Sequence, residues 1–432
     1  MMHIRLRRLL VNAALVVTCS PACAPRFVAP SNRCPDPRAL TRGFVELLAT
    51  VRYLSDDALE GRLAGSPGEQ CAGDYIAARF QQLGLRGAGP DGSYFQDVPL
   101  ASIVNPHASG DSGRNVLAVL DGADPRLRDE YIVIGAHYDH LGRGSMGSLA
   151  PDSPAIHNGA DDNASGVAAL LRAAALLRDR PRPARSVVFM AFTGEELGLL
   201  GSAHFTRAPT VPLERVRAML NLDMVGRLSA GPLIVYGVET AAEWRVVLQA
   251  EAQRHGLTLA LRGEGYGPSD HTSFYLSDIP VLHFFTNTHA DYHRPSDDWQ
   301  KIDVDGLERV AQLVASVTRS LATPATVLTL RRGAGQPPRM GGGYGAWLGT
   351  VPDFQPVERG VLLSGVTAGS PGDAAGLRRG DILIRLGNHE IKDLDAFTEA
   401  LRAHKPGDEV EVVVIRDARE VRLRAVLGRR GR

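Results

Sequence analysis

The sequence predicts an α/β fold in which a mixed, mostly parallel sheet is sandwiched by helices, followed by a small α+β domain. Two observations lead to this prediction. From Arg114 to Leu321, short apolar runs alternate with longer amphipathic segments, which is typical of parallel strands joined by helices. Past a stretch rich in Pro and Gly, Pro324–Gly345, the pattern changes to short strands and turns with two helical pieces.

The larger region contains the elements of the predicted sheet in a regular order. Its strands are expected at Arg114–Leu120, Tyr131–Asp139, Arg185–Thr193, Val216–Gly226 and Pro280–Thr286. Its helices are expected at Ala72–Leu85, Ser165–Asp179, Glu196–Arg207, Ala242–Gly256 and Val304–Leu321. Helices on both sides of such strands would cover both faces of the sheet.

The length of the chain and the position of its Pro- and Gly-rich segment indicate its domain organisation. A chain of 432 residues is long enough for two or three domains. We expect a leader at residues 1–24, a large domain at 35–323, a linker at 324–342 and a second domain at 343–430. The formal net charge of +0 gives no electrostatic footprint for nucleic acid, so no nucleic-acid partner is expected.

The first residues resemble an export signal. Three arginines precede the apolar run Leu9–Val17, small residues follow, and cleavage is expected after Ala22. The run is too short to span a membrane as a stable helix. The alternative is a core helix at the N-terminus. The sequence therefore predicts an exported protein, periplasmic or extracellular.

The four cysteines fall into two groups. Cys19 and Cys23 lie in the leader, and a lipid on either would make the protein a lipoprotein; we expect contact with a membrane only in that case. Neither is preceded by a good lipobox. Cys34 and Cys71 remain in the mature chain, where an oxidising compartment would favour a disulfide between them.

Metal-ligating side chains lie at the expected strand ends of the large domain. His137 and Asp223 end two strands, and Asp162, Glu196 and His293 lie in loops. Ligands bind at the carboxyl ends of strands in open parallel sheets. Imidazole nitrogen with carboxylate oxygen suits zinc, and one carboxylate can bridge two metal ions about 3.5–4 Å apart.

Each of these residues, taken alone, has a structural alternative. His137 could be an ordinary hydrogen-bonded histidine, whereas in a metal site Asp139 could fix the tautomer of the ligating ring. Asp162 could cap the helix that follows it. The adjacent glutamates Glu195 and Glu196 could lie in a solvated loop. Their joint placement favours a metal centre, in which one glutamate binds a metal while the other acts as a general base.

Six segments in series resemble the motifs of the aminopeptidase-Y-type co-catalytic zinc metallopeptidases of clan MH, which have the zinc exopeptidase fold. The similarity covers about residues 47–321, and the motifs occur in the family's order. No single motif is decisive, but the series is specific. The segments are GAHYDH, GADDNASG, FTGEELGLLGS, NLDMVG, SDHTSF and DYHRPSDD.

The resemblance implies a site with two Zn²⁺ ions. His137 and Asp223 would bind one ion, Glu196 and His293 the other, and Asp162 both. Every ligand position of the family pattern is present.

The resemblance also implies an aminopeptidase acting on peptides with a free N-terminus, through a water that bridges the metals. Glu195 would be the general base, Asp139 would orient His137, and Tyr292 is the candidate donor to the substrate oxyanion. Asp270 and His271 would line the pocket or cap a helix.

The C-terminal region resembles a circularly permuted PDZ domain of the bacterial type. GSPGDAAGLRRGD, Gly369–Asp381, carries most of the resemblance. Such domains bind an extended peptide as an added strand, so a peptide or protein ligand is expected. The loop Tyr344–Thr350 departs from the usual Gly-Leu-Gly-Phe form, which puts binding of a terminal carboxylate in doubt. The alternative is a packing domain that binds nothing.

Alternative functions remain open at the level of sequence. A related glutaminyl cyclase or carboxypeptidase would keep the fold and change the reaction. A non-catalytic binding scaffold would keep the fold and lose ligands, whereas this chain has all five ligands and the base. The number of metal ions and the end of the substrate that is attacked would separate these functions.

Overall fold

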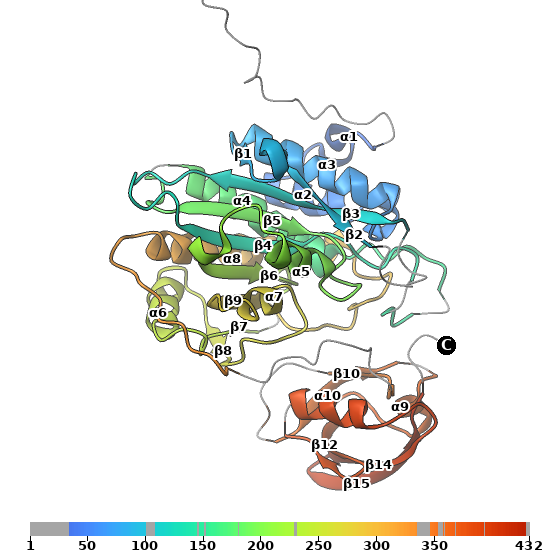
Figure 1. Cartoon of the computed structure of the whole chain (residues 1–432). Coiled ribbons are helices and arrows are strands. Elements are labelled where there is room, and N and C mark those ends of the chain that lie inside the picture. Colours follow the sequence, from blue (N-terminus) through green and yellow to red (C-terminus); the bar gives the residue numbers. More distant parts are fainter. Residues whose placement is uncertain are drawn as a thin grey trace, which may run out of the picture.

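The computed structural model shows a large α/β domain followed by a smaller, mainly β domain (Figure 1). It describes residues 34–100, 109–144, 147–150, 153–179, 181–228, 231–334, 346–352, 357, 359–367, 369–392 and 394–428. The predicted leader, with Ala22, Cys19 and Cys23, lies outside these residues. Among the described helices, none combines the length and apolar character needed to cross a bilayer.

A nine-stranded sheet forms the centre of the large domain (Figure 1). Its order is β1-β3-β5-β4-β6-β9-β7-β8, with β2 paired to β3. The central strands β5, β4, β6 and β9 are parallel, whereas β3 and β7 run antiparallel to their inner neighbours. The strands are β1 Arg86–Gly87, β2 Phe95–Pro99, β3 Ser112–Leu120, β4 Tyr131–His137, β5 Ser186–Phe192, β6 Val216–Leu222, β7 Leu233–Tyr236, β8 Leu259–Leu261 and β9 Val281–Phe285.

Helices cover both faces of this sheet, so the domain has three layers. Ile132 and Ile134 of β4 point into a core shared with α2, α3, α4, α6 and α8. Val133 of the same strand points the other way, into a core shared with α5 and α7. The helices are α1 Pro37–Thr41, α2 Glu46–Leu54, α3 Pro67–Gln82, α4 Gly166–Arg178, α5 Leu200–Arg207, α6 Trp244–Arg254, α7 His271–Tyr275 and α8 Val304–Leu321. The predicted fold class is therefore confirmed.

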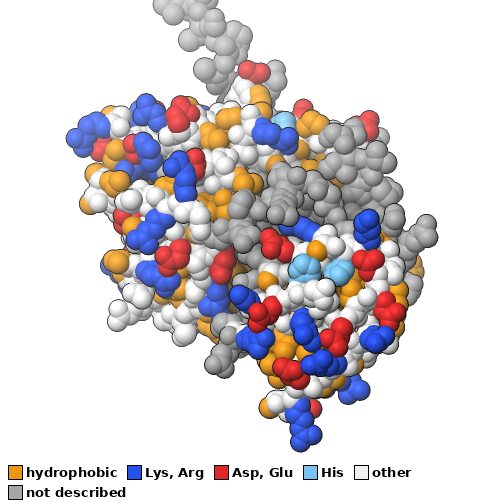
Figure 2. All heavy atoms as spheres, turned by 60° about the horizontal axis from the view of Figure 1, so that its bottom comes forward, with side chains coloured by type: hydrophobic (Ala, Val, Ile, Leu, Met, Phe, Trp, Pro, Cys, Tyr) orange, Lys and Arg blue, Asp and Glu red, His pale blue; other side chains and the backbone are white. Residues whose placement is uncertain are grey.

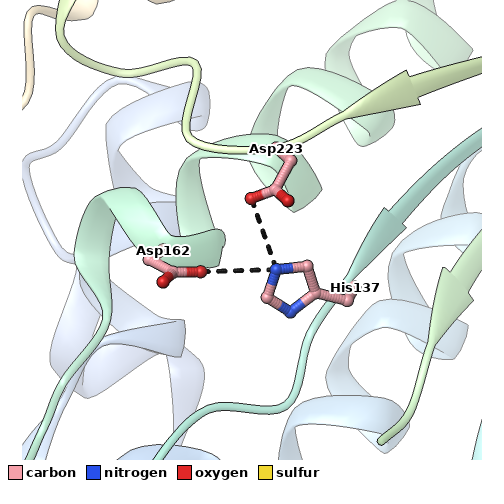
Figure 3. Close-up of side chains that lie close together, drawn as sticks. All are labelled: His137, Asp162 and Asp223. Atoms are coloured by element: carbon pink, nitrogen blue, oxygen red, sulfur yellow. Dashed lines mark hydrogen bonds and ion pairs between the residues drawn. The ribbon is translucent and has the colours of Figure 1, made fainter. Parts of the chain in front are cut away.

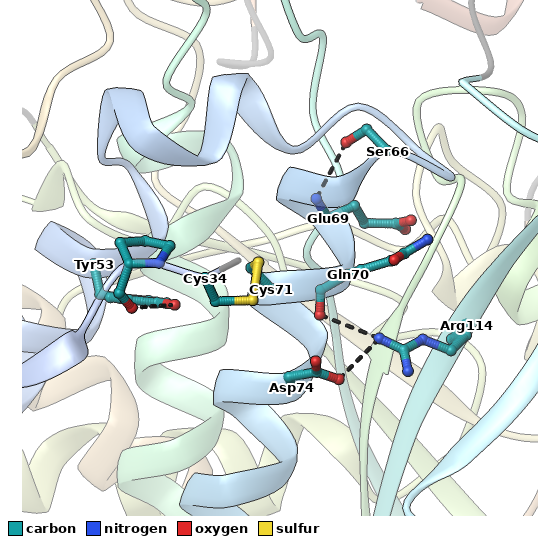
Figure 4. Close-up of a disulfide and its surroundings, with 9 residues drawn as sticks. Cys34, Tyr53, Ser66, Glu69, Gln70, Cys71, Asp74 and Arg114 are labelled. Carbon is teal, nitrogen blue, oxygen red and sulfur yellow. Dashed lines mark hydrogen bonds and ion pairs between the residues drawn. A yellow bond between two sulfur atoms is a disulfide. The ribbon is translucent and has the colours of Figure 1, made fainter. Parts of the chain in front are cut away.

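A disulfide ties the segment before α1 to α3. Cys34 and Cys71 are bonded, with their Cα atoms 5.4 Å apart, and Cys71 lies in α3 (Figure 4). Next to it, Arg114 of β3 forms an ion pair with Asp74 and donates to the carbonyl of Gln70. The pairing expected from the cysteine count is present in the structure.

The smaller domain contains an antiparallel sheet with its own core. The strand order is β10-β11-β12-β14-β15, with β13 paired to β12. Leu363, Leu383 and Val412 are among the buried residues of this core. Its elements are β10 Thr350–Pro352, β11 Val361–Val366, α9 Pro371–Ala374, β12 Ile382–Leu386, β13 His389–Glu390, α10 Leu394–Ala403, β14 Glu409–Arg416 and β15 Arg419–Val426.

The segment between the domains is partly attached to the large one. Arg332 forms a two-point ion pair with Asp278, and Ala334 donates its N–H to the Tyr275 hydroxyl. Leu330 forms an isolated bridge with Ala241. Residues 335–342 of the predicted linker lie outside the described residues. The described part of the linker, 324–334, therefore holds to the large domain at several points.

Several element boundaries differ from those predicted. The helix expected at Glu196–Arg207 begins only at Leu200, because Gly194 and Gly198 adopt positive φ and the intervening residues form turns. The helix expected to begin at Ala72 begins at Pro67, where the Ser66 hydroxyl accepts from the Glu69 N–H as an N-cap. The strand expected to end at Asp139 ends at His137. The prediction omitted β1, β2, β7 and β8, and for α7 it gave no bounds beyond a possible cap at Asp270 and His271.

Candidate metal centre

The side chains expected at the site converge at the carboxyl edge of the parallel strands. His137 is the last residue of β4, and Asp223 follows β6 directly. Glu196 lies in the turns after β5, and His293 lies in the loop after β9. Asp162 belongs to η3 (Ala160–Ser165), the helical turn that leads into α4. Five segments far apart in the chain thus supply the five predicted ligands.

One group of ligand atoms forms around His137. Its Nε2 lies 3.3 Å from Asp162 Oδ1 and 3.4 Å from Asp223 Oδ1. Figure 3 shows both carboxylates facing the same ring nitrogen. The three ligand atoms lie within 4.8 Å of one another, as they must to share a metal ion.

A second group forms on the other side of Asp162. His293 Nε2 lies 3.1 Å from Asp162 Oδ2 and 3.4 Å from Glu196 Oε2. The two oxygens of Asp162 therefore face two different groups of ligands. Such an arrangement suits a carboxylate that bridges two ions.

A third histidine, His140, lies in the second group and has no role in the sequence prediction. Its Nδ1 is 2.8 Å from Glu196 Oε1 and 3.9 Å from Asp162 Oδ2, and the ring is buried. Its Nε2 has no hydrogen-bond partner among the described residues. The only sequence signal for it is its place in the HYDH segment, three residues after His137. His140, Asp162 and Glu196 could also hold a metal together.

Asp139 acts mainly on the loop that carries the two glutamates. Its Oδ1 accepts from the N–H of Glu195 at 3.1 Å, and its Oδ2 accepts from the N–H of Glu196 at 3.3 Å. Its carboxylate lies 3.7 Å from His137 Nδ1, whereas its main-chain carbonyl lies closer to that nitrogen, at 3.2 Å. The predicted contact between Asp139 and His137 is therefore made largely by the backbone.

The loop around Asp162 is held so that its carboxylate stays available. Asp297 Oδ2 accepts from the N–H groups of Asp161 and Asp162, at 2.9 and 3.0 Å. Asp161 Oδ1 accepts from the Gly226 N–H, and Asn163 Oδ1 accepts from the Gly166 N–H at the start of α4. The capping role considered for Asp162 therefore falls to Asn163.

The electrostatics of the metal-free centre follow from burial and crowding. Burial raises the pKa of Glu195 well above its usual value, and the charges of Glu196 and Asp223 raise it further. Burial also acts to raise the pKa of Asp162, but hydrogen bonds and charge from His137 and His293 hold it well below its usual value. Burial opposes protonation of His293, whereas Glu196 and Asp162 raise its pKa to about 9.

A cavity of about 340 Å³ opens onto this cluster. The five predicted ligands and Glu195 line it, together with apolar, aromatic and other charged side chains. Four of its lining residues, Val357, Gly360, Val361 and Lys392, belong to the smaller domain. Thr288 of the large domain donates its hydroxyl to the carbonyl of Pro352 in β10, which joins the domains beside the cavity. The substrate space is thus built from both domains.

The remaining candidates occupy different positions. Tyr292 lines the cavity and stacks on His293, with ring centroids 3.8 Å apart. His271 lines it too, stacked on His283 at 4.5 Å, and burial lowers its pKa well below the usual value. Asp270 is buried, and burial raises its pKa to about 7. His271 lies within α7 and Asp270 directly before it, and the Asp270 side chain makes no cap hydrogen bond.

The donor set fits zinc. Only imidazole nitrogens and carboxylate oxygens meet here, with no thiolate among them. Buried carboxylates this close together destabilise the folded state through desolvation and mutual repulsion. A divalent cation at each group of ligands would supply the compensating positive charge.

Comparison with known proteins supports this interpretation. The family model for Peptidase family M28 matches residues 115–318, and that for the PDZ domain matches residues 352–427. Leupeptin-inactivating enzyme 1 of Streptomyces exfoliatus is 27% identical over 67% of this chain and 58% of its own length. Aminopeptidase YwaD of Bacillus subtilis is 30% identical over 43% of this chain and 40% of its own length. The chain thus spans about half the length of these two relatives.

Solved structures share the fold of the large domain. A Zn-dependent exopeptidase of Parabacteroides distasonis matches with a TM-score of 0.52 and 20% identity, over 63% of this chain and 96% of its own. Glutaminyl cyclase of Porphyromonas gingivalis matches with a TM-score of 0.51 and 20% identity over the same shares. Residues 115–318 of the chain thus resemble Peptidase family M28, and residues 352–427 resemble a PDZ domain.

Proposed function

We propose that this protein is an exported di-zinc aminopeptidase that removes the first residue from peptides with a free N-terminus. The observation that carries the proposal is the position of Asp162, whose two oxygens lie between two separate groups of ligands. One of the relatives is an aminopeptidase of Bacillus subtilis, which supports the same reaction.

Five residues would hold the two ions. His137 and Asp223 would bind one, Glu196 and His293 the other, and Asp162 would bind both. Bound zinc would polarise the scissile carbonyl and make water more acidic. His140 donates from Nδ1 toward Glu196 Oε1, which would leave Oε2 facing His293 and the metal.

Glu195 is the proposed general base. Its side chain lines the cavity beside the ligands without belonging to either ligand group. The Asp139 carboxylate fixes the backbone of Glu195 and Glu196, so one glutamate is held as base while its neighbour is held as ligand. A carboxylate held beside the ligands can accept a proton from water and return it to the leaving amine.

Tyr292 is the proposed hydrogen-bond donor to the substrate oxyanion. It lines the cavity next to His293, and burial raises the pKa of its hydroxyl well above the usual value, so the hydroxyl keeps its proton. Donors held ready at the place where negative charge develops contribute strongly to acyl-transfer catalysis.

Export is proposed from the leader and from the disulfide. Residues 1–24 have the arrangement of a signal peptide, and a bond between Cys34 and Cys71 is typical of an oxidising compartment. The PDZ domain is proposed to bind an extended peptide or protein segment.

Metal analysis of the purified full chain combined with a screen of aminoacyl-anilides tests the proposed activity. Two zinc ions per chain and release of an amine from at least one anilide are expected. One zinc per chain, with cyclisation of an N-terminal glutamine and no release of an amino acid, would instead identify a glutaminyl cyclase. The shared fold with the Porphyromonas gingivalis enzyme is the observation that favours this second function. Attack at the free carboxyl end of a peptide would identify a carboxypeptidase, and no hydrolysis at all would identify a scaffold.

A further inference from the structure

A buried arginine from the N-terminal region lies beneath the metal centre. Arg62 ends the short helical segment η1 (Asp57–Arg62), more than fifty residues before the part of the chain that matches the M28 family. Its side chain is fully buried. None of the six family segments includes this residue.

The guanidinium of Arg62 binds backbone carbonyls from three separate segments. Its Nε donates to Tyr138 O at 2.8 Å, and one terminal nitrogen donates to Asn158 O at 2.7 Å and to Leu54 O. The other terminal nitrogen donates to Gly159 O at 3.1 Å. All three side-chain nitrogens are thus used to hold the backbone.

Two of these segments carry proposed metal ligands. Tyr138 directly follows His137, and Gly159 comes three residues before Asp162. The backbone of η1 adds to this link, because Arg62 O accepts from the N–H of His140 at 3.1 Å. Arg62 therefore links the end of β4, which carries His137, to the loop that carries Asp162.

The charge of Arg62 also matters at this position. Burial lowers the pKa of Arg62 to about 10, while the carboxylates of Asp139, Asp162 and Glu196 act to raise it, so the guanidinium stays charged at neutral pH. A fixed cation among these buried acids offsets part of their mutual repulsion.

We propose that Arg62 is a positioning residue of the metal centre, which sets the distance between His137 and Asp162 and thereby the affinity for zinc. The inference rests on the proposed zinc site and deepens it. Arg62 is expected to act through the backbone of the ligands, because all four of its hydrogen bonds go to carbonyls.

Competition for zinc by a chelator tests this inference without measuring catalysis. Arg62→Met in the full chain is expected to release zinc at a chelator concentration at least tenfold lower than wild type, since partners behind metal ligands affect affinity by about 10–100-fold. Arg62→Lys keeps the charge but cannot reach all four carbonyls, so an intermediate shift is expected. If the methionine variant does not fold, the lysine variant decides the question.

Arg185 offers a matched control. It is also buried and also donates to two carbonyls, those of Leu321 and Thr323, but it lies at the start of β5, at the opposite end of the strand from the catalytic loop. Arg185→Lys is expected to lower thermal stability with no change in the chelator midpoint. Equal zinc affinity in wild type and Arg62→Lys, with only a lower melting temperature, would overturn the inference. Absence of zinc from the wild type would instead refute the proposed function.

Discussion

The two domains differ in the partners of their buried carboxylates. In the PDZ domain, buried Asp381 accepts two hydrogen bonds from the Arg416 guanidinium at 2.7 Å and one from the Arg378 N–H at 2.8 Å. In the peptidase domain, buried Asp162 faces two histidines that also contact other carboxylates. A buried acid paired with its own arginine supports the fold, whereas buried acids that share the same histidines are typical of a metal centre.

The outer surface does not show this difference. On the face drawn in Figure 2, acidic and basic side chains are interspersed over the smaller domain and the neighbouring surface, and neither sign forms one large area. The balanced net charge of the chain agrees with this. On this face, the surface charges therefore give no indication of the buried cluster of histidines and carboxylates.

Among the variants proposed for this comparison, Glu195→Gln is expected to have the largest effect, a loss of catalytic activity. Loss of a general base should lower kcat by about 10²–10⁴-fold. The amide matches the carboxylate in size and leaves the five proposed ligands in place, so zinc content should stay at two ions. Steady-state kinetics with an aminoacyl-anilide and metal analysis measure the two quantities. Glu390→Gln on the PDZ surface is the control, and unchanged kcat in Glu195→Gln would remove this residue as the base.

Cys71→Ser tests whether the two domains are stabilised independently. The disulfide joins residues separated by 37 positions, and a closed loop of that size contributes about 4 kcal/mol in the chain-entropy model. We expect the unfolding transition of the peptidase domain to fall and that of the PDZ domain to stay, as measured by calorimetry. Reduction of the wild type should reproduce the shift. A fall in the PDZ transition as well would show that the domains unfold together.

Asp381→Ala and Asp162→Asn together test the contrast in buried acids. Removing Asp381 leaves Arg416 without its carboxylate, so the PDZ domain should lose about 3 kcal/mol of unfolding free energy. Replacing Asp162 removes a carboxylate that His137 and His293 hold in its charged form, so without metal the large domain should lose stability, and zinc binding should also be lost. Thermal unfolding with chelator present and metal analysis check both expectations. Zinc retained by Asp162→Asn, or zinc lost by Asp381→Ala, would contradict the comparison.

Glu69→Gln tests a buried acid of the peptidase domain that is not a proposed ligand. Burial, with the charge of Asp139, raises the pKa of Glu69 to about 8, while it accepts from the Gly65 N–H at 2.6 Å and bonds to the Thr193 hydroxyl. The native state therefore holds this proton to higher pH than the unfolded chain does, and stability should fall as pH rises from about 4.5 to 8. Glu69→Gln lacks this titration. The free energy of unfolding of wild type should therefore fall relative to that of the variant as the pH rises through this range. A constant difference would show that Glu69 is ionised in the native state.

Lys392→Ala tests the contribution of the PDZ domain to the cavity and should have the smallest effect. An exposed lysine at the cavity wall is expected to change kcat/KM for a tripeptide by about twofold and to leave a small anilide unaffected. Lys405→Ala, in an exposed turn of the same domain, is the control. Equal effects on both substrates would show that the lysine does not contact the distal part of the peptide.

Sequence predicted the sheet, its helical layers and the convergence of the five ligands, because these depend on apolar periodicity and on where parallel strands end. β7 and β8 were missed because they have only four and three residues, too few for a clear periodic signal. The beginning of α5 was placed too early because the turn chemistry of two glycines overrides helical propensity.

The parts of the site that sequence did not predict are those that depend on tertiary packing. His140 reaches Glu196, and Arg62 reaches Gly159, only because the chain folds back over long separations. The PDZ wall of the cavity depends on how two domains lie against each other, which no local pattern encodes. Distances and burial were needed to find all three.

The position of Arg62 has a practical consequence for dissecting this protein. A fragment cut at the start of the matched family region would retain every proposed ligand and the base, yet it would lack the guanidinium behind His137 and Asp162 and the Cys34–Cys71 bond. The smallest piece expected to load zinc in vitro therefore begins before Cys34, so boundaries for expression should be drawn from the contacts of the fold instead of from the edge of a family match.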